Sequence, residues 1–94
     1  MLSIKRKDGD AILFVVDGET VKLVCKIDNG VKLYYGRKLV IKLDYEGESN
    51  TFKVFDRPVI ITYCEDRQHN SAALGFDADR SVKIYRDDFQ GAQS

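Results

Sequence analysis

The arginines near the two ends of the chain stand in the same residue pattern. Residues 2–6 and residues 82–86 both read apolar-x-apolar-x-Arg, ending in Arg6 and Arg86. Because side chains alternate between the two faces of a β-strand, each arginine shares a face with two apolar residues. A guanidinium at the edge of an apolar row either forms a surface ion pair, here with one of the two acids after Arg86, or faces a ligand. Its planar fork of donors suits bidentate contact with a phosphate or a guanine.

The elements that must position these arginines all read as strands. Apolar runs and alternation predict strands near residues 2–5, 11–16, 21–27, 31–35, 39–43, 52–54, 59–63, 72–76 and 82–84. No helix of ten or more residues is predicted, and DDFQGAQS at 87–94 offers at most one short C-terminal turn. We therefore predict an all-β fold, a small and mostly antiparallel sheet or barrel of eight or nine short strands.

Three polar segments are predicted to connect these strands. Asp28-Asn29-Gly30 predicts a hairpin turn, because Asn-Gly tolerates positive φ. EGESN at 46–50 is predicted to be a loop, and EDRQHNS at 65–71 a polar turn.

Length and composition indicate one small globular domain. The chain has 94 residues, of which 44% are apolar and 32% charged, and its formal net charge is zero. A neutral chain does not coat nucleic acid by bulk charge, but a local basic patch stays possible. A core of this size is marginal, so association with a second copy is a natural supplement.

No enzymatic site, cofactor or metal site is expected. The sequence has no glycine-rich phosphate loop and no Ser/His/Asp arrangement. Cys25 and Cys64 lie in apolar stretches and are predicted to be buried thiols, with a disulfide or a metal site as the alternative. His69 is the only histidine, and no cysteine pair has the spacing of zinc ligands. No run of 18 apolar residues and no signal-type apolar segment occurs, so we predict a cytoplasmic protein with no membrane partner.

A set of lysines alternates with apolar residues in the middle of the chain, namely Lys22, Lys26, Lys32, Lys38 and Lys42. These lysines are interpreted as the solvent face of a sheet, and an extended RNA platform is the alternative. Tyr34 and Tyr35 must point to opposite faces of a strand. One of them is therefore expected to be exposed, where its ring can stack on a base.

Both chain ends resemble one protein family. MLSIKRKDGDAIL at 1–13 resembles the N-terminus of the carbon storage regulator family of bacterial translational regulators, with Met-Leu, a basic pair, Gly9 and an acid at position 10. LGFDADRSVKIYRDDF at 74–89 is similar to that family's C-terminal signature. The order and positions of the two motifs match the family.

The resemblance divides the single domain, 1–94, into two parts. Residues 1–14 and 58–89 match the family core, and about 15–57 form an inserted β-hairpin region of roughly forty residues. In a rival alignment residues 18–35 belong to the core and the insertion moves to about 36–73.

The family fold implies an interlocked homodimer. Residues 2–7 of one copy would pair with 82–86 of the other, and the two arginine rows would form one composite surface. The family's ligand is a GGA-containing single-stranded loop in an mRNA leader or a small RNA, and binding changes translation. A protein antagonist is a further expected partner.

Carried over residue by residue, the RNA-binding set is Ile4, Lys5, Arg6, Lys7, Ala78, Asp79, Arg80, Val82, Ile84, Tyr85, Arg86 and Asp87. Arg86 is its strongest member. Asp79 differs from the family pattern by placing a carboxylate where phosphate should approach, and Tyr85 stands where His is frequent. The alternative function is a β-sheet protein-interaction module whose strand edge captures a partner without sequence-specific RNA binding. A small barrel with no nucleic-acid role is the third hypothesis.

Overall fold

The computed structural model describes residues 2–68 and 71–86, which are almost entirely strand and turn. The strands are β1 (Leu2–Lys7), β2 (Ala11–Val16), β3 (Glu19–Ile27), β4 (Val31–Tyr35), β5 (Lys38–Leu43), β6 (Ser49–Val54), β7 (Arg57–Gln68), β8 (Ser71–Ala78) and β9 (Lys83–Arg86). No residue in the two described ranges is helical. The predicted all-β class is confirmed, whereas the predicted turn at 87–94 lies outside the described residues.

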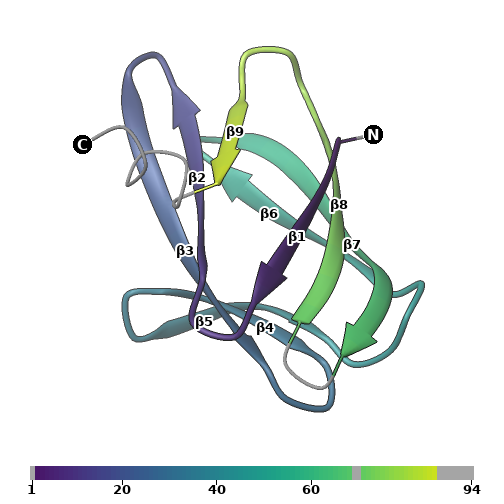
Figure 1. Ribbon diagram of the computed structural model, residues 1–94. Helices are drawn as coiled ribbons and strands as arrows, with labels where there is room; N and C mark the ends of the chain where they lie inside the picture. The colour runs from purple at the N-terminus through teal and green to yellow at the C-terminus, as the bar shows by residue number, and fades with distance from the viewer. Residues whose placement is uncertain (1, 69–70, 87–94) are drawn as a thin grey trace.

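Two antiparallel sheets form the molecule, with the strand orders β1-β8-β7-β6 and β5-β4-β3-β2-β9. The chain crosses between the sheets after β1, after β5 and after β8 (Figure 1). Along one side of the molecule β5 contacts β6. On the other side of the molecule β1 is the last strand of the first sheet and β9 the last strand of the second. The strands that carry the two arginine rows are therefore both edge strands.

The core lies between the sheets and is built from the alternating inward residues. Phe14 of β2 is fully buried at its centre. The Phe14 ring lies 5.9 Å from the ring of Phe76, edge to face, and 6.3 Å from that of Phe52. Residues of the predicted insertion, such as Leu23 and Leu33, belong to the same core cluster. Whether this region is an insertion depends on the family alignment and stays a prediction.

A tight turn at residues 7–10 carries the chain from one sheet to the other. The backbone amide of Lys7 donates to the Asp10 carboxylate at 2.9 Å, and the Asp10 amide donates to the Lys7 carbonyl at 2.9 Å. Gly9 adopts φ of +90°, a conformation that a side chain rarely tolerates. The Asp8 carboxylate accepts the Ile27 amide at 2.8 Å, which docks the turn on β3. The Lys-Asp-Gly-Asp motif therefore has a structural function.

Two predicted connections are wrong in part. The predicted polar turn at 65–71 is mostly strand, since β7 runs to Gln68 and β8 begins at Ser71. The pairing of β7 with β8 extends as far as Gln68 and Ser71 because backbone pairing does not require apolar side chains. The predicted loop at 46–50 is shortened for the same reason, because β6 begins at Ser49 and pairs with β7.

Truncation of Phe14 tests the core. We expect Phe14→Ala to lower the free energy of unfolding by about 3–5 kcal/mol, because it leaves a cavity between Phe52 and Phe76. Urea unfolding followed by circular dichroism measures the change. The control is Phe55→Ala, since Phe55 is 48% exposed at the β6–β7 turn and its removal should cost less than about 1 kcal/mol. Equal losses for the two variants would contradict the assignment of Phe14 to the core.

Candidate nucleic-acid interface

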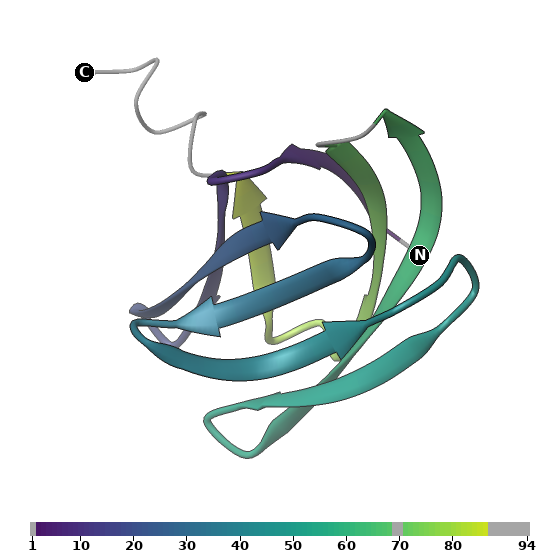
Figure 2. The same cartoon turned by 90° about the horizontal axis from the view of Figure 1, so that it is seen from below.

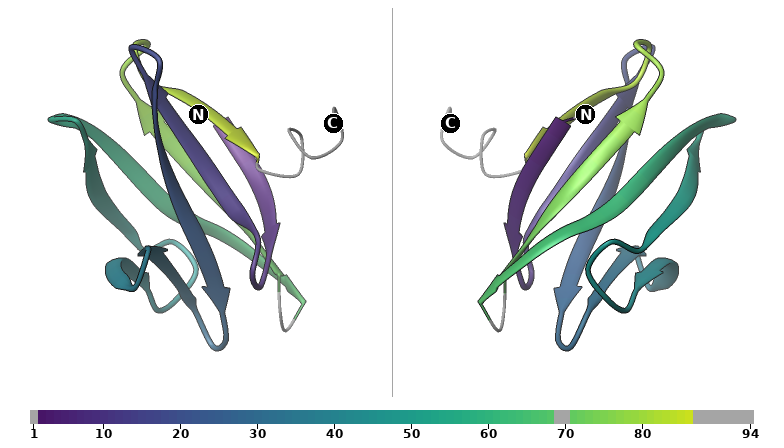
Figure 3. Two further views of the ribbon diagram at one scale, coloured as in Figure 1. Left: turned by 90° about the vertical axis from the view of Figure 1, so that its left-hand side faces the viewer. Right: turned by 90° about the vertical axis from the view of Figure 1, so that its right-hand side faces the viewer.

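The end strands β1 and β9 face each other along the side of the molecule where the two sheets are not connected by strand pairing. They point in the same direction in Figure 1 and lie next to each other in both views of Figure 3. Within residues 2–68 and 71–86, β1 pairs only with β8 and β9 only with β2. The facing edge of each strand has no strand partner in that part of the chain. Such edges are available for pairing with a ligand or another chain.

Two adjoining hollows lie along these edges, and together we call them the β1–β9 cleft. The first has a volume of about 340 Å³ and is lined by Leu2, Ser3, Ile4, Ile84, Tyr85 and Arg86. The second, of about 300 Å³, is lined by Leu2, Phe76, Asp77, Ala78, Asp79, Arg80, Val82, Lys83 and Ile84. They share Leu2 and Ile84, and charged side chains such as Asp79, Lys83 and Arg86 also line them.

The cleft brings together most of the predicted RNA-binding residues. Eight of them line it, namely Ile4, Ala78, Asp79, Arg80, Val82, Ile84, Tyr85 and Arg86. Lys5 and Lys7 are exposed on β1 but do not line the cleft. Asp87 lies outside the described residues. The cleft is also lined by five residues outside the predicted set, namely Leu2, Ser3, Phe76, Asp77 and Lys83. Leu2 belongs to the first arginine row, and the last three lie within the matched C-terminal segment.

Arg6 does not face the cleft, which corrects its prediction as a ligand contact. Its side chain is only 4% exposed. Its Nε donates to the Lys5 carbonyl at 2.7 Å and its Nη1 to the Ala11 carbonyl at 3.1 Å, and Nη1 lies 3.8 Å from the Asp10 carboxylate. The guanidinium is thus a structural group that ties the end of β1 to the start of β2. Sequence alternation indicated the correct face for Arg6 but not the depth at which that face is buried.

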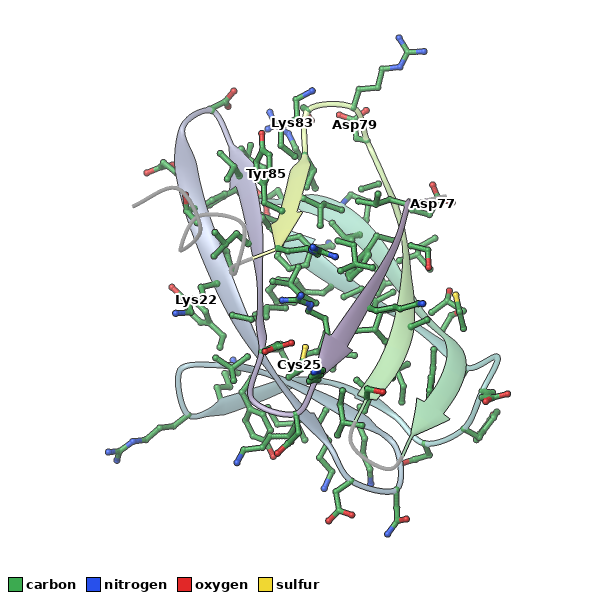
Figure 4. The ribbon with its side chains drawn as sticks, viewed as in Figure 1. Lys22, Cys25, Asp77, Asp79, Lys83 and Tyr85 are labelled. Carbon is green, nitrogen blue, oxygen red and sulfur yellow. The ribbon has the colours of Figure 1, made fainter. Side chains whose placement is uncertain are left out.

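Arg86 is much more exposed than Arg6. Arg86 is exposed and pairs with Ile12 of β2, whose side chain faces the core. The Arg86 side chain therefore lies on the same face of the sheet as Ile12, at the end of β9. Tyr85, 42% exposed, pairs with Leu13 and points to the outer face. Figure 4 shows Tyr85 and Lys83 on β9, with Asp79 on the segment that leads into it. Arg86 and Tyr85 both line the cleft, although their side chains project from opposite faces of β9.

Asp79 folds the loop before β9. Its carboxylate accepts hydrogen bonds from the Ser81 hydroxyl and, at 3.4 Å, from the Ser81 amide, and its carbonyl accepts the Val82 amide at 3.0 Å. The hydrogen bonds from Ser81 hold the pKa of the Asp79 carboxyl below its usual value. Asp79 is consequently ionised at neutral pH. The cleft then carries two carboxylates, Asp77 and Asp79, beside the three cations Arg80, Lys83 and Arg86.

The two cysteines differ in exposure. Cys25 is fully buried, and burial raises the pKa of its thiol to about 12, against the opposing effect of the Arg6 charge. Cys64 is exposed on β7, which corrects its prediction as a buried thiol. Both thiols are free. Among residues 2–64 and 71–86, whose side chains are described, no group of three His, Cys, Asp or Glu could hold a metal ion, and His69 lies outside these ranges.

Comparisons of the chain with models of protein families, with curated proteins and with solved structures found no match. The resemblance to the carbon storage regulators therefore rests on the two terminal motifs, and membership of that family stays a prediction. Within the described ranges no helix is long and apolar enough to cross a membrane.

Thiol reactivity tests the assignment of the two cysteines. We expect a disulfide reagent that reacts with thiolates to modify one equivalent of thiol in the native protein and two in urea, because the Cys25 thiol is buried and stays protonated at neutral pH. Absorbance of the released aromatic thiolate measures both values. Cys64→Ser should abolish the native reaction and leave that of Cys25 in urea. Rapid modification of Cys25 in the native protein would contradict its burial.

Proposed function

We propose that the protein is a post-transcriptional regulator that binds GGA-containing single-stranded loops of mRNA leaders in the β1–β9 cleft. The observation that carries the proposal is the juxtaposition of β1 and β9. These are the two segments whose motifs resemble the carbon storage regulators, and they line one cleft. No catalytic step is proposed, and the site of action is the cytoplasm.

The chemistry of the cleft suits unpaired purines. Unpaired loop bases expose Watson–Crick edges, and the amides and carbonyls of strand edges can read them. Arg86 can donate two hydrogen bonds to guanine or to a phosphate, and the half-exposed ring of Tyr85 offers a stacking surface. The apolar side chains of Leu2 and Ile84, which line both hollows, suit the faces of bases.

The proposal includes a homodimer, as the family resemblance implies. In the single chain β1 already lies beside β9, so one copy forms a cleft without help from a second. The unpaired edges of the two strands support association, because a second copy can supply the missing strand partners. An interlocked pair would form the same β1–β9 surface from two chains.

The second candidate function is a protein-interaction module. It is favoured by the same two strand edges, because an extended peptide that enters between β1 and β9 would gain main-chain hydrogen bonds on both sides. It requires no base recognition.

Removal of the Arg86 side chain separates the two candidates. We expect Arg86→Ala to weaken binding of a hairpin with GGA in its loop by about 1–3 kcal/mol, because bidentate contact with guanine is lost. Fluorescence anisotropy of the labelled hairpin measures the affinity, and a hairpin with a scrambled loop measures specificity. Arg37→Ala is the matched control, since it removes the same exposed charge from the β4–β5 turn.

The wild-type protein must also prefer GGA to the scrambled loop, and its affinity must fall as salt rises. Equal affinity for the two loops would reject the proposed regulator and leave the protein-interaction module.

The loop carboxylate of Asp79 offers a gain-of-affinity test. We expect Asp79→Asn to strengthen hairpin binding severalfold, because a negative charge at the rim of the cleft is removed while the amide oxygen can still accept the Ser81 hydrogen bonds. The same anisotropy titration measures it. Asp28→Asn removes an exposed carboxylate from the β3–β4 turn, no residue of which lines the cleft, and should leave the affinity unchanged. A weaker complex with Asp79→Asn would argue against phosphate near this loop.

A further inference from the structure

Three lysines stand directly opposite one another on the outer face of the second sheet. Lys26 of β3 pairs with Lys32 of β4, and Lys32 pairs with Lys42 of β5. Their neighbours in sequence face the core, and all three lysine side chains are exposed. We call this row the lysine ladder. Side chains directly opposite in an antiparallel pair have Cβ atoms about 4.5–5.5 Å apart, so three positive charges are held in one line.

The ladder is poorly neutralised by the protein. Lys42 has an acidic partner, the Asp44 carboxylate at 3.8 Å. Among residues 2–64 and 71–86, whose side chains are described, Lys26 and Lys32 have no ion pair or side-chain hydrogen bond. Like charges directly opposite in a sheet are destabilising, so the row weakens the fold unless an anion covers it.

An apolar row runs beside the ladder. Val24 of β3 pairs with Tyr34 of β4, and Tyr34 pairs with Leu39 of β5, two positions along from the lysines on β3 and β4. Val24 and Tyr34 are half-buried, and Leu39 is 43% exposed. One row thus offers cations for phosphates, and the next offers an aromatic ring and apolar side chains for base faces. An acidic polypeptide would use the lysines but has no planar bases for the apolar row.

We propose that the lysine ladder, with the adjoining Val24–Tyr34–Leu39 row, binds single-stranded nucleic acid through its phosphodiester backbone and without base specificity. This surface is separate from the β1–β9 cleft: in Figure 2 the strands β4 and β5 lie in front and β9 lies behind them. None of the ladder residues lines the cleft. The inference therefore does not depend on GGA recognition.

Charge reversal of the central lysine gives the sharpest test. The probe is a labelled 15-nucleotide oligo-uridine, which contains no GGA, and fluorescence anisotropy is recorded from 50 to 200 mM salt. We expect Lys32→Glu to weaken binding roughly tenfold at low salt and to lower the slope of log affinity against log salt by about 0.7 or more. The same variant should raise the thermal unfolding midpoint, because the new carboxylate would face Lys26 on one side and Lys42 on the other.

Two controls keep the outcome decisive. Lys53→Glu reverses one exposed charge on β6 of the other sheet and should leave oligo-uridine binding within about twofold of wild type. Lys53→Gln, the control for charge removal, should also leave it unchanged. If Lys32→Glu itself folds poorly, Lys26→Gln/Lys32→Gln tests the same surface by charge removal and should lower the salt slope by about 1.4.

Several results would overturn the inference. The first is no binding of oligo-uridine at 50 mM salt, and the second is an equal loss of affinity in Lys32→Glu and Lys53→Glu. The third is a loss of oligo-uridine affinity in Arg86→Ala while Lys32→Glu keeps it, which would place the oligonucleotide in the cleft. Displacement of the oligonucleotide by polyglutamate of equal charge as efficiently as by unlabelled oligo-uridine would assign the ladder to acidic polypeptides instead.

Discussion

The buried guanidinium of Arg6 is the interaction on which the arrangement of the two sheets depends. A charge in a protein interior is tolerated only when its donors are satisfied, and here two carbonyls and the nearby Asp10 carboxylate surround it. Those carbonyls belong to Lys5 and Ala11, on either side of the crossing between the sheets. The turn at 7–10 completes the crossing with its own hydrogen bonds. As a result β1 is an edge strand of one sheet, whereas β2 is an interior strand of the other.

The same constraint creates the cleft. The chain passes to the second sheet directly after β1, so β1 does not pair with β2. The edge of β2 that β1 would have covered pairs with β9 instead. The two end strands then face each other with unpaired edges, which small barrels usually close or cover. Exposed lysines on the outer faces, Lys5 and Lys7 on β1 and Lys83 on β9, disfavour uncontrolled edge pairing. The cleft remains open to a specific ligand, whether an RNA loop, a peptide or a second copy.

Two features of the fold lower its stability without an evident structural benefit. One is the lysine ladder, where like charges oppose each other across three strands. The other is the β6–β7 turn, where Phe55 and Asp56 both adopt positive φ, a conformation that Asn and Gly accept more readily. Local choices that oppose the fold are concentrated at functional sites in many proteins. The proposed binding of nucleic acid would account for the ladder, whereas nothing in the structure explains Phe55.

Alternation of apolar residues by itself determined the all-β class, most strand positions and the shared face of each arginine with its apolar row. It did so because strand periodicity is a local property of the backbone. Burial depth, register and the neighbours of each strand were decided only by the tertiary structure. Arg6 and Arg86 show the difference: the same pattern places one guanidinium inside the core against two carbonyls and leaves the other exposed at the rim of a cleft. The lysines at 26, 32 and 42 were predicted to be solvent-facing, but only strand pairing aligned them, because register depends on contacts between residues far apart in the chain.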